Sequence, residues 1–457
     1  KLLHGGEVNE GVFWKLDGGI LTIYGEGEMK NFSTTYYGRS PWYGFSDEIR
    51  SIVVENGITG IGNNCFRECP NLTKVALPDT LTDIGWSAFE SCSGLERIEI
   101  PEGVTALESS TFWGCGKLEE IGLPESLVRI GSSVFRGCTS LKSIEFPEKL
   151  KEIGNDAFEE CDSLAQLEFA EDAVLESIGV SAFAGAPIEE LVLPDSLKSV
   201  GEWAFNGCLQ LKRLDTGAGL QKIGQNAFGD CTLLETVTLG NSLKEMMYDS
   251  FDNCTALKTL ILKAKDIESI HSESVFEEST IERLTVSADV DRLTYDFMSS
   301  LGTDLKDMVL EGPNEFVYEG KDLLVHTSGG DILLTEKHSP YLVNEKGELV
   351  RRGTCGENLT WRLEDGRLEI SGSGEIYDYS AQNPAPWADF REKIEEIAIG
   401  DSVTGIGDYA FAECDNIGKA VIGNAVTDIG GHAFANCDNL EAVTMPENLQ
   451  HLGEGAF

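Results

Sequence analysis

The chain repeats itself every 23 residues, and this period constrains its fold more than any other feature. Three consecutive segments read LTKVALPDTLTDIGWSAFESC from Leu72, LERIEIPEGVTALESSTFWGC from Leu95 and LEEIGLPESLVRIGSSVFRGC from Leu118. A fixed period of roughly 20 to 50 residues is typical of solenoids and other repeat architectures. The repeat phenylalanine recurs, mostly at 23-residue steps, at Phe66, Phe89, Phe112, Phe135, Phe158, Phe183, Phe205, Phe228, Phe251, Phe276, Phe411, Phe434 and Phe457.

Each unit contains two apolar patterns that predict its local structure. Val75 and Leu77 alternate ahead of a proline, which predicts a strand with one inward face. Residues 81–85 predict a second short extended run, and residues 88–92 predict a single helical or 3₁₀ turn against the core. One unit buries too little apolar surface to offset the entropy of ordering it, so the units must stack on one another.

The sequence therefore predicts a β-rich solenoid made of two arrays of stacked coils, where a coil is one 23-residue turn of the chain. The first array covers residues 49–310 and the second covers residues 394–457. Because the second array stops in mid-repeat at Phe457, we expect it to be truncated there. The twelve strands expected in the first array begin near Ile49, Leu72, Leu95, Leu118, Leu141, Leu164, Ile188, Leu211, Leu234, Leu257, Ile281 and Leu305, and those of the second near Ile394, Ile417 and Leu440.

The repeat motif resembles a known family. The pattern I-G-x-x-A-F-x-x-C-x-x-L-x-x-I-x-I-P, which covers most of the chain, is similar to the BspA-type leucine-rich repeat, also called the Treponema pallidum type. The resemblance implies the α/β leucine-rich repeat fold. Members of that family are chiefly secreted or surface-attached proteins of host-associated bacteria, so it also implies an extracellular or cell-surface location, and adhesion or ligand binding rather than catalysis.

Two segments outside the repeat are copies of each other and predict caps. Residues 1–48 contain VFWKLDGGILTIYGEGEMKNFS, and residues 355–393 contain LTWRLEDGRLEISGSGEIYDYS. Alternating apolar residues around Asp-Gly predict a β-hairpin in each, covering the open end of the array that follows. Between the arrays, residues 311–354 are predicted to hold a hairpin insertion over 316–334 and then a polar connector.

Charge excludes two classes of partner. Lys and Arg number 35 and Asp and Glu 78, so the net charge is 35 − 78 = −43. This field repels phosphate backbones and anionic lipid headgroups, which argues against nucleic-acid binding. No stretch approaches the about 20 apolar residues that span a bilayer, so we expect no membrane insertion within this segment.

The residues that could carry chemistry predict neither a cofactor, a metal site nor a catalytic site. The six histidines are scattered, and no nucleophile or metal motif accompanies them. Ten of the twelve cysteines follow the repeat phenylalanine by three residues and form one row. Because Ala186 and Ser279 occupy the same slot, we expect it to select small side-chain volume and to hold buried free thiols.

The remaining candidate is a surface. The residue between the two inward positions of each strand faces outward, and stacking aligns these residues in a ladder. We predict that this sheet face binds a protein with a basic patch, with an apolar anchor near Ile261 and Val309; the alternative is an ordinary solvated strand face. The candidate binding residues are Glu99, Glu120, Glu145, Glu168, Glu190, Asp215, Ile261 and Val309.

The aromatic residues Trp86, Trp113 and Trp203 lie near the phenylalanine turn, where they could stack on sugar rings or lie partly buried against a neighbouring coil. The prediction is thus a non-catalytic extracellular or cell-surface recognition or adhesion protein that binds a host or matrix protein, with a glycan as a possible ligand. The alternative is a carbohydrate-binding or spacer module of a larger secreted surface enzyme.

Overall fold

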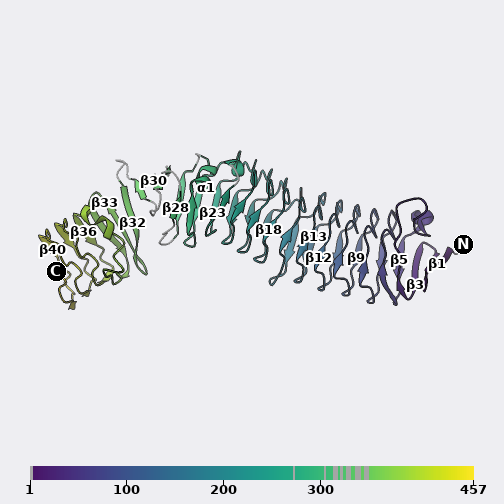
Figure 1. Cartoon of the computed structure of the whole chain (residues 1–457), viewed down its shortest axis with the longest axis horizontal. Helices are drawn as coiled ribbons and strands as arrows, with labels where there is room; N and C mark the ends of the chain where they lie inside the picture. The colour runs from purple at the N-terminus through teal and green to yellow at the C-terminus, as the bar shows by residue number, and fades with distance from the viewer. Residues whose placement is uncertain are drawn as a thin grey trace. The chain divides into compact units, whose positions relative to one another are not determined.

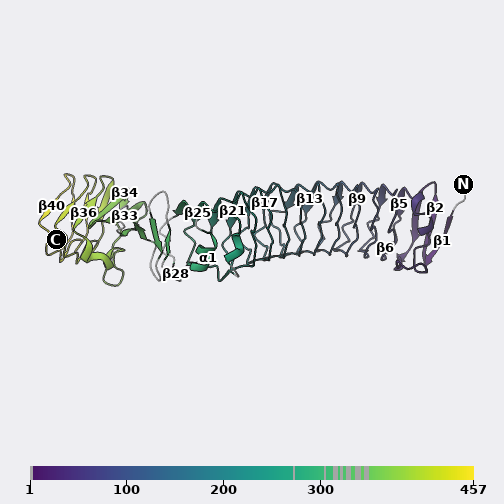
Figure 2. The same ribbon diagram turned by 90° about the horizontal axis from the view of Figure 1, so that it is seen from above.

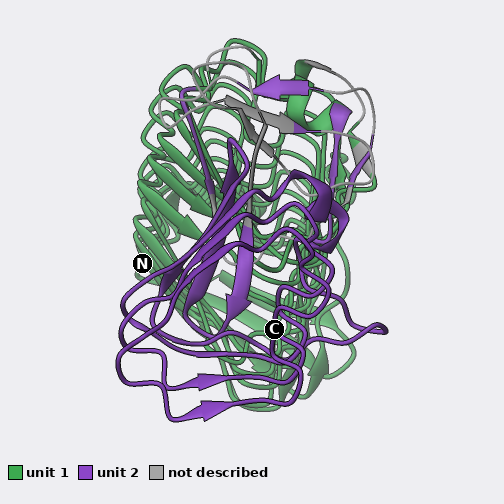
Figure 3. Cartoon of the chain, turned by 90° about the vertical axis from the view of Figure 1, so that its left-hand side faces the viewer, with its two compact units in different colours: residues 1–290, 296–305 green, residues 291–295, 306–457 purple. Residues whose placement is uncertain are grey.

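The computed structural model describes residues 4–270, 273–302, 305–311, 317–319, 323–325, 331–334, 341–343 and 349–457. The chain forms two compact units, one of residues 1–290 and 296–305 and one of residues 291–295 and 306–457 (Figure 3). Each unit is built from stacked coils with parallel strands, which confirms the predicted β-solenoid. The five-part division of the chain by residue number stays a prediction.

One side of each coil in the first unit is a short parallel strand. Most neighbouring strands are paired residue for residue, as in Ile52 opposite Val75 and Leu260 opposite Leu284, while the pairing is interrupted between residues 120–122 and 143–146 and between residues 166–169 and 190–192. Figure 1 shows these strands following one another along the unit. Their bounds are β5 Ser51–Val54, β7 Lys74–Ala76, β9 Arg97–Glu99, β11 Glu120–Gly122, β13 Ser143–Phe146, β15 Gln166–Phe169, β17 Glu190–Val192, β19 Arg213–Asp215, β21 Thr236–Leu239, β23 Thr259–Leu262 and β25 Arg283–Val286.

A second, narrower strand follows the next turn of each coil, as the second extended run predicted, and this turn contains a proline in five of the coils. One inward residue per strand reaches the core, for example Ile130 opposite Ile153. The bounds are β6 Ile58–Ile61, β8 Asp83–Ile84, β10 Ala106–Leu107, β12 Arg129–Ile130, β14 Glu152–Ile153, β16 Ser177–Ile178, β18 Ser199–Val200, β20 Lys222–Ile223, β22 Glu245–Met246 and β24 Ser269–Ile270.

The third side of the coil differs from the prediction. It is mostly a run of hydrogen-bonded turns rather than a helical turn, because Ser87 and Ser91 have left-handed φ angles of 52° and 60° that a right-handed helix does not accommodate. Alternate backbone N–H groups therefore point at the next coil, as in Phe89 N to Thr111 O at 2.9 Å. Among the described residues, helix occurs in this unit only as η1 (Tyr43–Glu48), η2 (Glu273–Phe276) and α1 (Tyr295–Ser300), which begins in the second unit.

The repeat phenylalanines form a continuous column through the first unit. All the rings from Phe66 to Phe276 are buried, and successive ring centroids lie between 4.9 and 5.6 Å apart with interplanar angles of 2° to 29°. The strand spacing of about 4.8 Å sets this separation, which lies within the range of favourable aromatic stacking. The column explains why the phenylalanine is the most regular residue of the repeat.

The cysteine row lies beside this column. All twelve cysteines are free, and all but Cys437 are fully buried. Most of the row's thiols donate a hydrogen bond to the carbonyl oxygen of the preceding coil's phenylalanine, as in Cys92 to Phe66 at 3.1 Å and Cys161 to Phe135 at 3.1 Å. The Ser279 hydroxyl donates to Phe251 O in the same way, at 3.2 Å. The slot therefore holds a small side chain, as the sequence suggested, and in most coils that side chain is also a donor; Ala186 shows that the donor is not required.

Burial makes these thiols weak acids. It raises the pKa of Cys115 and of Cys414 to about 12, because the apolar surroundings disfavour the thiolate. A thiolate is the reactive form of cysteine, so we expect Cys115 and Cys414 to be unreactive while the fold is intact.

The first cap is the predicted hairpin, and it continues the sheet. Its strands are β1 His4–Asn9, β2 Val12–Asp17, β3 Ile20–Gly25 and β4 Gly27–Glu28. β2 pairs antiparallel with β3, which then pairs parallel with β5. Gly25 has a φ of 115°, and a Cβ there would lie 2.0 Å from Gly11 O, so only glycine fits this turn.

Tryptophan replaces phenylalanine where the column meets each cap. Trp42 is buried, stacks on Phe66 at 5.7 Å and donates from Nε1 to Cys65 O at 2.8 Å. In the second unit Trp387 stacks on Phe411 at 5.2 Å and donates to Ala410 O at 2.9 Å. Each cap thus closes its array with a larger ring that also satisfies a carbonyl oxygen.

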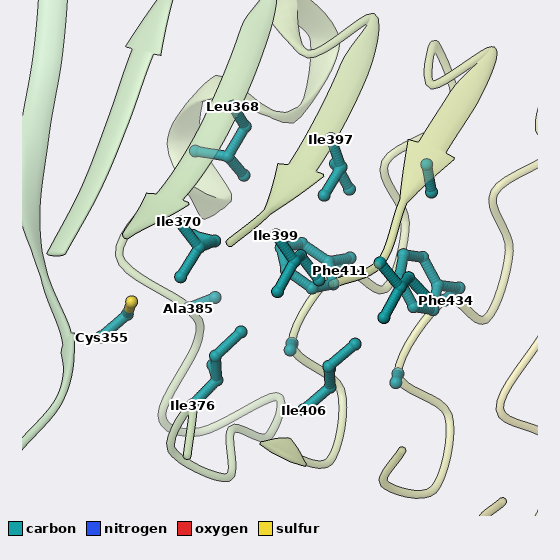
Figure 4. Close-up of a cluster of buried hydrophobic side chains, with 14 of the residues drawn as sticks. Cys355, Leu368, Ile370, Ile376, Ala385, Ile397, Ile399, Ile406, Phe411 and Phe434 are labelled. Atoms are coloured by element: carbon teal, nitrogen blue, oxygen red, sulfur yellow. The ribbon is translucent and has the colours of Figure 1, made fainter. Parts of the chain in front are cut away.

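The second unit repeats the plan of cap and array. β33 pairs antiparallel with β34, which pairs parallel with β36. Figure 4 shows side chains from both strand sides and the turn side gathered in its core, including Ile399, Ile406 and Phe411. The elements are β32 Leu349–Gly356, β33 Leu359–Glu364, β34 Arg367–Gly372, β35 Gly374–Glu375, η3 Ala388–Lys393, β36 Glu396–Ile399, β37 Val403–Ile406, β38 Lys419–Val421, β39 Asp428–Ile429, β40 Ala442–Thr444 and β41 His451–Leu452.

The segment before the second cap is richer in strand than its composition suggested. The predicted hairpin over 316–334 is formed by β29 (Leu323–Val325) and β30 (Asp331–Leu334), while β28 (Val317–Glu319) pairs with β26 (Arg292–Thr294). Its connecting residues, and Phe316, lie outside the described residues. The twelfth strand expected near Leu305 is β27 (Asp307–Leu310). Within the predicted polar connector, β31 (Tyr341–Val343) and the start of β32 pair with each other.

The phenylalanine column generates a stability prediction. Phe158→Ala removes a ring stacked 5.0 Å from Phe135 and 4.9 Å from Phe183. We expect a loss of about 3–5 kcal/mol in the free energy of unfolding of the first unit, because the cavity cannot close in a stack held in register. Urea unfolding followed by circular dichroism measures it. The control Trp86→Ala, at a ring 59% exposed, should cost about 1 kcal/mol or less, and equal losses would contradict the column's role.

The thiol row generates a prediction about pH. Burial raises the pKa of Cys115 from 9.0 to about 12 in the folded chain, so the stability that this protonated thiol contributes is present below pH 9 and lost as the pH rises toward 12. We therefore expect the buried thiols to resist a disulfide reagent at about pH 8 and to react after denaturation. Absorbance of the released thiolate measures the reaction. Rapid modification of Cys115 in the folded chain would refute the prediction, whereas the half-buried Cys437 should react first.

Candidate functional site

The candidate sheet face consists of the outward residues of the long strands in the first unit. Figure 2 shows β9, β13, β17 and β21 along one side of that unit. Glu99 lies opposite Gly122, Glu145 opposite Glu168, and Val192 opposite Asp215, so the predicted residues do form in-register rows. Alternation within each strand sends the neighbouring residues into the core, as with Ile144 between Ser143 and Glu145.

Two of the predicted acids are paired with cations on adjacent strands. Arg97 forms an ion pair with Glu120, and Arg213 Nη1 lies 3.7 Å from Glu190 Oε1. All four side chains are well exposed, so solvent screens these pairs and each is worth little stability. The pairing reduces the net charge that Glu120 and Glu190 present to a partner.

Glu145 and Glu168 are different, because they face each other directly across β13 and β15. Both side chains are exposed. Within the part of the chain that the structure describes, neither has an ion pair or a side-chain hydrogen bond. The centre of the face therefore carries two adjacent uncompensated carboxylates.

The far end of the face changes from acidic to apolar, but its exposure is lower than expected. Asp215 is half-buried and accepts a hydrogen bond from Gly217 N at 3.0 Å. Ile261 is also half-buried, and so is Val309, which belongs to β27 in the second unit. The most exposed apolar residue of the strand ladder is instead Val192, at 68%. Val192 follows the two carboxylates along the chain by one coil.

The turn side carries the tryptophans. Trp86, Trp113 and Trp203 are all partly exposed. The Arg136 guanidinium of the next coil lies 6.0 Å from the centroid of the Trp113 ring. Arg136 also forms an ion pair with Glu159 at 3.0 Å. These rings are therefore held at the surface by neighbouring coils rather than buried between them.

Sequence reasoning missed one cluster of exposed aromatics, in the first cap. Tyr36 and Tyr37 project from the loop that precedes Trp42, and both are almost fully exposed. The available signal was that TTYYGRS has no counterpart in the second cap, where the loop reads SAQNP.

No group of three or more His, Cys, Asp or Glu in the described part of the chain lies close enough to hold a metal ion. Among the described residues, no helix has the length and apolarity to cross a bilayer. What the arrangement can do is present a long, regular array of side chains to another molecule.

Comparison with known proteins agrees with this architecture. The family model described as BspA type leucine rich repeat region matches residues 42–174, 176–301 and 389–457, in six copies. No curated protein matched the chain.

Several solved bacterial structures are similar to the chain. A leucine-rich repeat protein from Bacteroides ovatus is 19% identical, with 98% of this chain and 90% of that chain covered and a TM-score of 0.46. A leucine rich cell surface protein from Faecalibacterium prausnitzii is 16% identical over 69% of this chain and 96% of its own, with a TM-score of 0.32. The Treponema pallidum leucine rich repeat protein is 21% identical over 55% and 91%, with a TM-score of 0.30.

The matched residues make up more than half of the sequence and coincide with the stacked coils of both units. The chain belongs to the BspA-type leucine-rich repeat family.

Proposed function

We propose that this chain is a non-catalytic recognition protein, acting outside the cell or on its surface, which binds a host or matrix protein through the sheet face of the first unit. Its family is typical of bacterial surface proteins, and leucine-rich repeats generally serve in protein interactions. The net charge of −43 favours a partner with a basic patch.

The observation that carries the proposal is the pair Glu145 and Glu168. Like charges directly opposite each other across paired strands destabilise a sheet. Elsewhere neighbouring coils place opposite charges together, as in Lys142 with Glu119 at 3.1 Å and Lys212 with Glu189 at 3.2 Å. Two unpaired carboxylates in the middle of the face cost stability, and binding to a basic partner offsets that cost.

Val192 completes the proposed contact. It is exposed, apolar and on the same face, and the core of a protein interface is commonly apolar with a charged surround. The carboxylates would steer the encounter, and Val192 would lose water on contact. Glu99, Glu120, Glu190, Asp215, Ile261 and Val309 stay predicted members of the binding surface.

Charge reversal tests the proposal. The chain is immobilised and titrated with laminin, fibronectin and collagen at low and at physiological ionic strength. We expect a partner whose on-rate falls with added salt, and Glu145→Lys with Glu168→Lys should lower the on-rate about tenfold at low salt, because steering depends on the local field.

A matched control distinguishes the effect of this face on the on-rate from the effect of the chain's net charge. Glu152→Lys with Glu176→Lys makes the same charge change in the same two coils, but at exposed positions on the second-sheet side. It should leave the on-rate close to that of the unaltered chain. Equal effects of the two double variants, or no binding to any of the three matrix proteins, would count against the proposed function.

A further inference from the structure

The loop that carries Tyr36 and Tyr37 is a closed, well-braced structure. Ser33 N donates to Gly38 O at 2.8 Å, and the hydroxyl groups of Ser33 and Thr35 lie 2.7 Å apart. A Cβ at Gly38 would lie 1.9 Å from Ser33 Oγ, so a larger residue there would displace the Ser33 hydroxyl from its contact with Thr35. The two tyrosines thus lie at the tip of a short loop, residues 33–38, that is closed by a backbone hydrogen bond.

The two tyrosine rings form an exposed aromatic platform. Tyr36 is 82% exposed and Tyr37 is 97% exposed, and their ring centroids lie 5.2 Å apart at an angle of 86°. A tyrosine ring offers an apolar face together with a hydroxyl group, so it suits ligands that have apolar C–H faces and polar edges. Sugar rings have this character.

Beside the platform is a shallow pocket with a polar lining. It is a surface depression whose enclosed volume is only about 20 Å³, since most of the space in front of it is open solvent. Small-molecule pockets are usually lined by apolar side chains, whereas this one is lined by hydroxyl, amide and charged groups. It lies between the loop and the turn side of the first coil, and its lining residues are Ser33, Thr34, Arg39, Ser40, Tyr43, Asn64, Arg67 and Glu68.

The charges around the pocket leave one cation uncompensated. Glu68 accepts a hydrogen bond from the Tyr43 hydroxyl at 2.7 Å and lies 3.3 Å from Arg67, so its charge is already neutralised. Arg67 also pairs with Glu90 at 2.8 Å. Arg39 instead lies over the Tyr43 ring at 4.0 Å and, within the described residues, has no carboxylate partner. Arg39 is exposed, so its guanidinium can reach an anion supplied by a ligand.

Comparison of the two caps indicates that these features are not needed for capping. Both caps keep the hairpin and the buried tryptophan, Trp42 in one and Trp387 in the other. The second cap has Ala, Gln and Asn at residues 381–383, within the stretch that corresponds to the tyrosine loop. The tyrosines and Arg39 are therefore not part of the capping plan that the two caps share.

We propose that the first cap binds a carboxylate-bearing sugar residue. The sugar's C–H face stacks on Tyr36 or Tyr37, its carboxylate pairs with Arg39, and its hydroxyl groups exchange hydrogen bonds with the polar pocket lining. Sialic acids and uronic acids share this chemistry. The site is separate from the sheet face, since it lies against the turn side of the first coil.

Saturation-transfer NMR on the whole chain tests the site with three probes: sialyllactose, a disaccharide ending in glucuronic acid, and neutral lactose. The measurement is made near physiological ionic strength, where the Debye length of about 8 Å screens the repulsion from distant carboxylates. We expect transfer to at least one acidic probe, with affinity about tenfold above that for lactose, because a charge-assisted bond to Arg39 adds to the stacking. The two acidic probes identify which source of carboxylate fits.

Variants locate the binding. Arg39→Gln should reduce affinity for the acidic probe about tenfold, to the level of lactose, and Tyr37→Ala should weaken every probe. Tyr377→Ala is the matched control, because Tyr377 is a 53% exposed tyrosine in the second cap. Circular dichroism confirms that each variant is folded.

Three results would overturn the proposal: no transfer to either acidic sugar, equal affinity for acidic and neutral probes, or binding that survives both Arg39→Gln and Tyr37→Ala. Loss of matrix-protein binding in Tyr37→Ala, without any sugar binding, would assign the loop to a protein contact instead. Because the Glu145 and Glu168 variants leave this cap unchanged, failure here is distinguishable from failure of the proposed sheet-face function.

Discussion

Hydrogen bonding between successive coils is the constraint on which the rest of the structure depends. On all three sides of a coil, backbone N–H groups are satisfied by carbonyl oxygens of the neighbouring coil, as with Phe112 N and Val134 O at 2.9 Å. An insertion in one coil must therefore bulge out of the stack, so that the strands and rings of neighbouring coils still face each other. Phe158 and Phe183 are separated by 25 residues, yet their rings stack at 4.9 Å and Ile153 still pairs with Ile178. The extra residues leave the stack in the surface segment 170–174, which costs little.

The sequence predicted the repeated parts of the fold because identical environments recur in every coil. Strand positions, the buried phenylalanines and both hairpins follow from alternation and from Asp-Gly turns. The turn side was harder, since the spacing of residues 88–92 suits a helical turn. The left-handed φ angles at Ser87 and Ser91 exclude a helical turn. Serine at these two positions is only a weak indication of such angles in the sequence. The donor role of the thiols also depends on carbonyl positions that no pattern in the chain reveals.

The candidate surface was predictable in position but not in exposure. Period-two alternation places Glu145, Val192 and Asp215 on one face, and strand pairing sets Glu145 opposite Glu168 and Val192 opposite Asp215. How far each side chain reaches solvent depends on the neighbouring turn, as when Asp215 bonds back to Gly217 N. The cap loop was not predictable, because residues 33–38 close on themselves through a contact specific to Gly38. Non-repeated segments have no second copy from which an environment can be inferred.

A fold that stabilises itself by stacking leaves its outward positions free to differ. The core slots repeat almost without variation, whereas outward positions range from paired charges, as in Arg213 with Glu190, to the unpaired Glu145 and Glu168. Paired positions add a small stabilisation and present little net charge, so a partner gains little by contacting them. Unpaired charges and bare aromatics contribute nothing to the solenoid. We therefore expect recognition to concentrate at side chains that do not stabilise the stack. These are Val192 with Glu145 and Glu168 on the sheet face, and Tyr37 with Arg39 in the first cap.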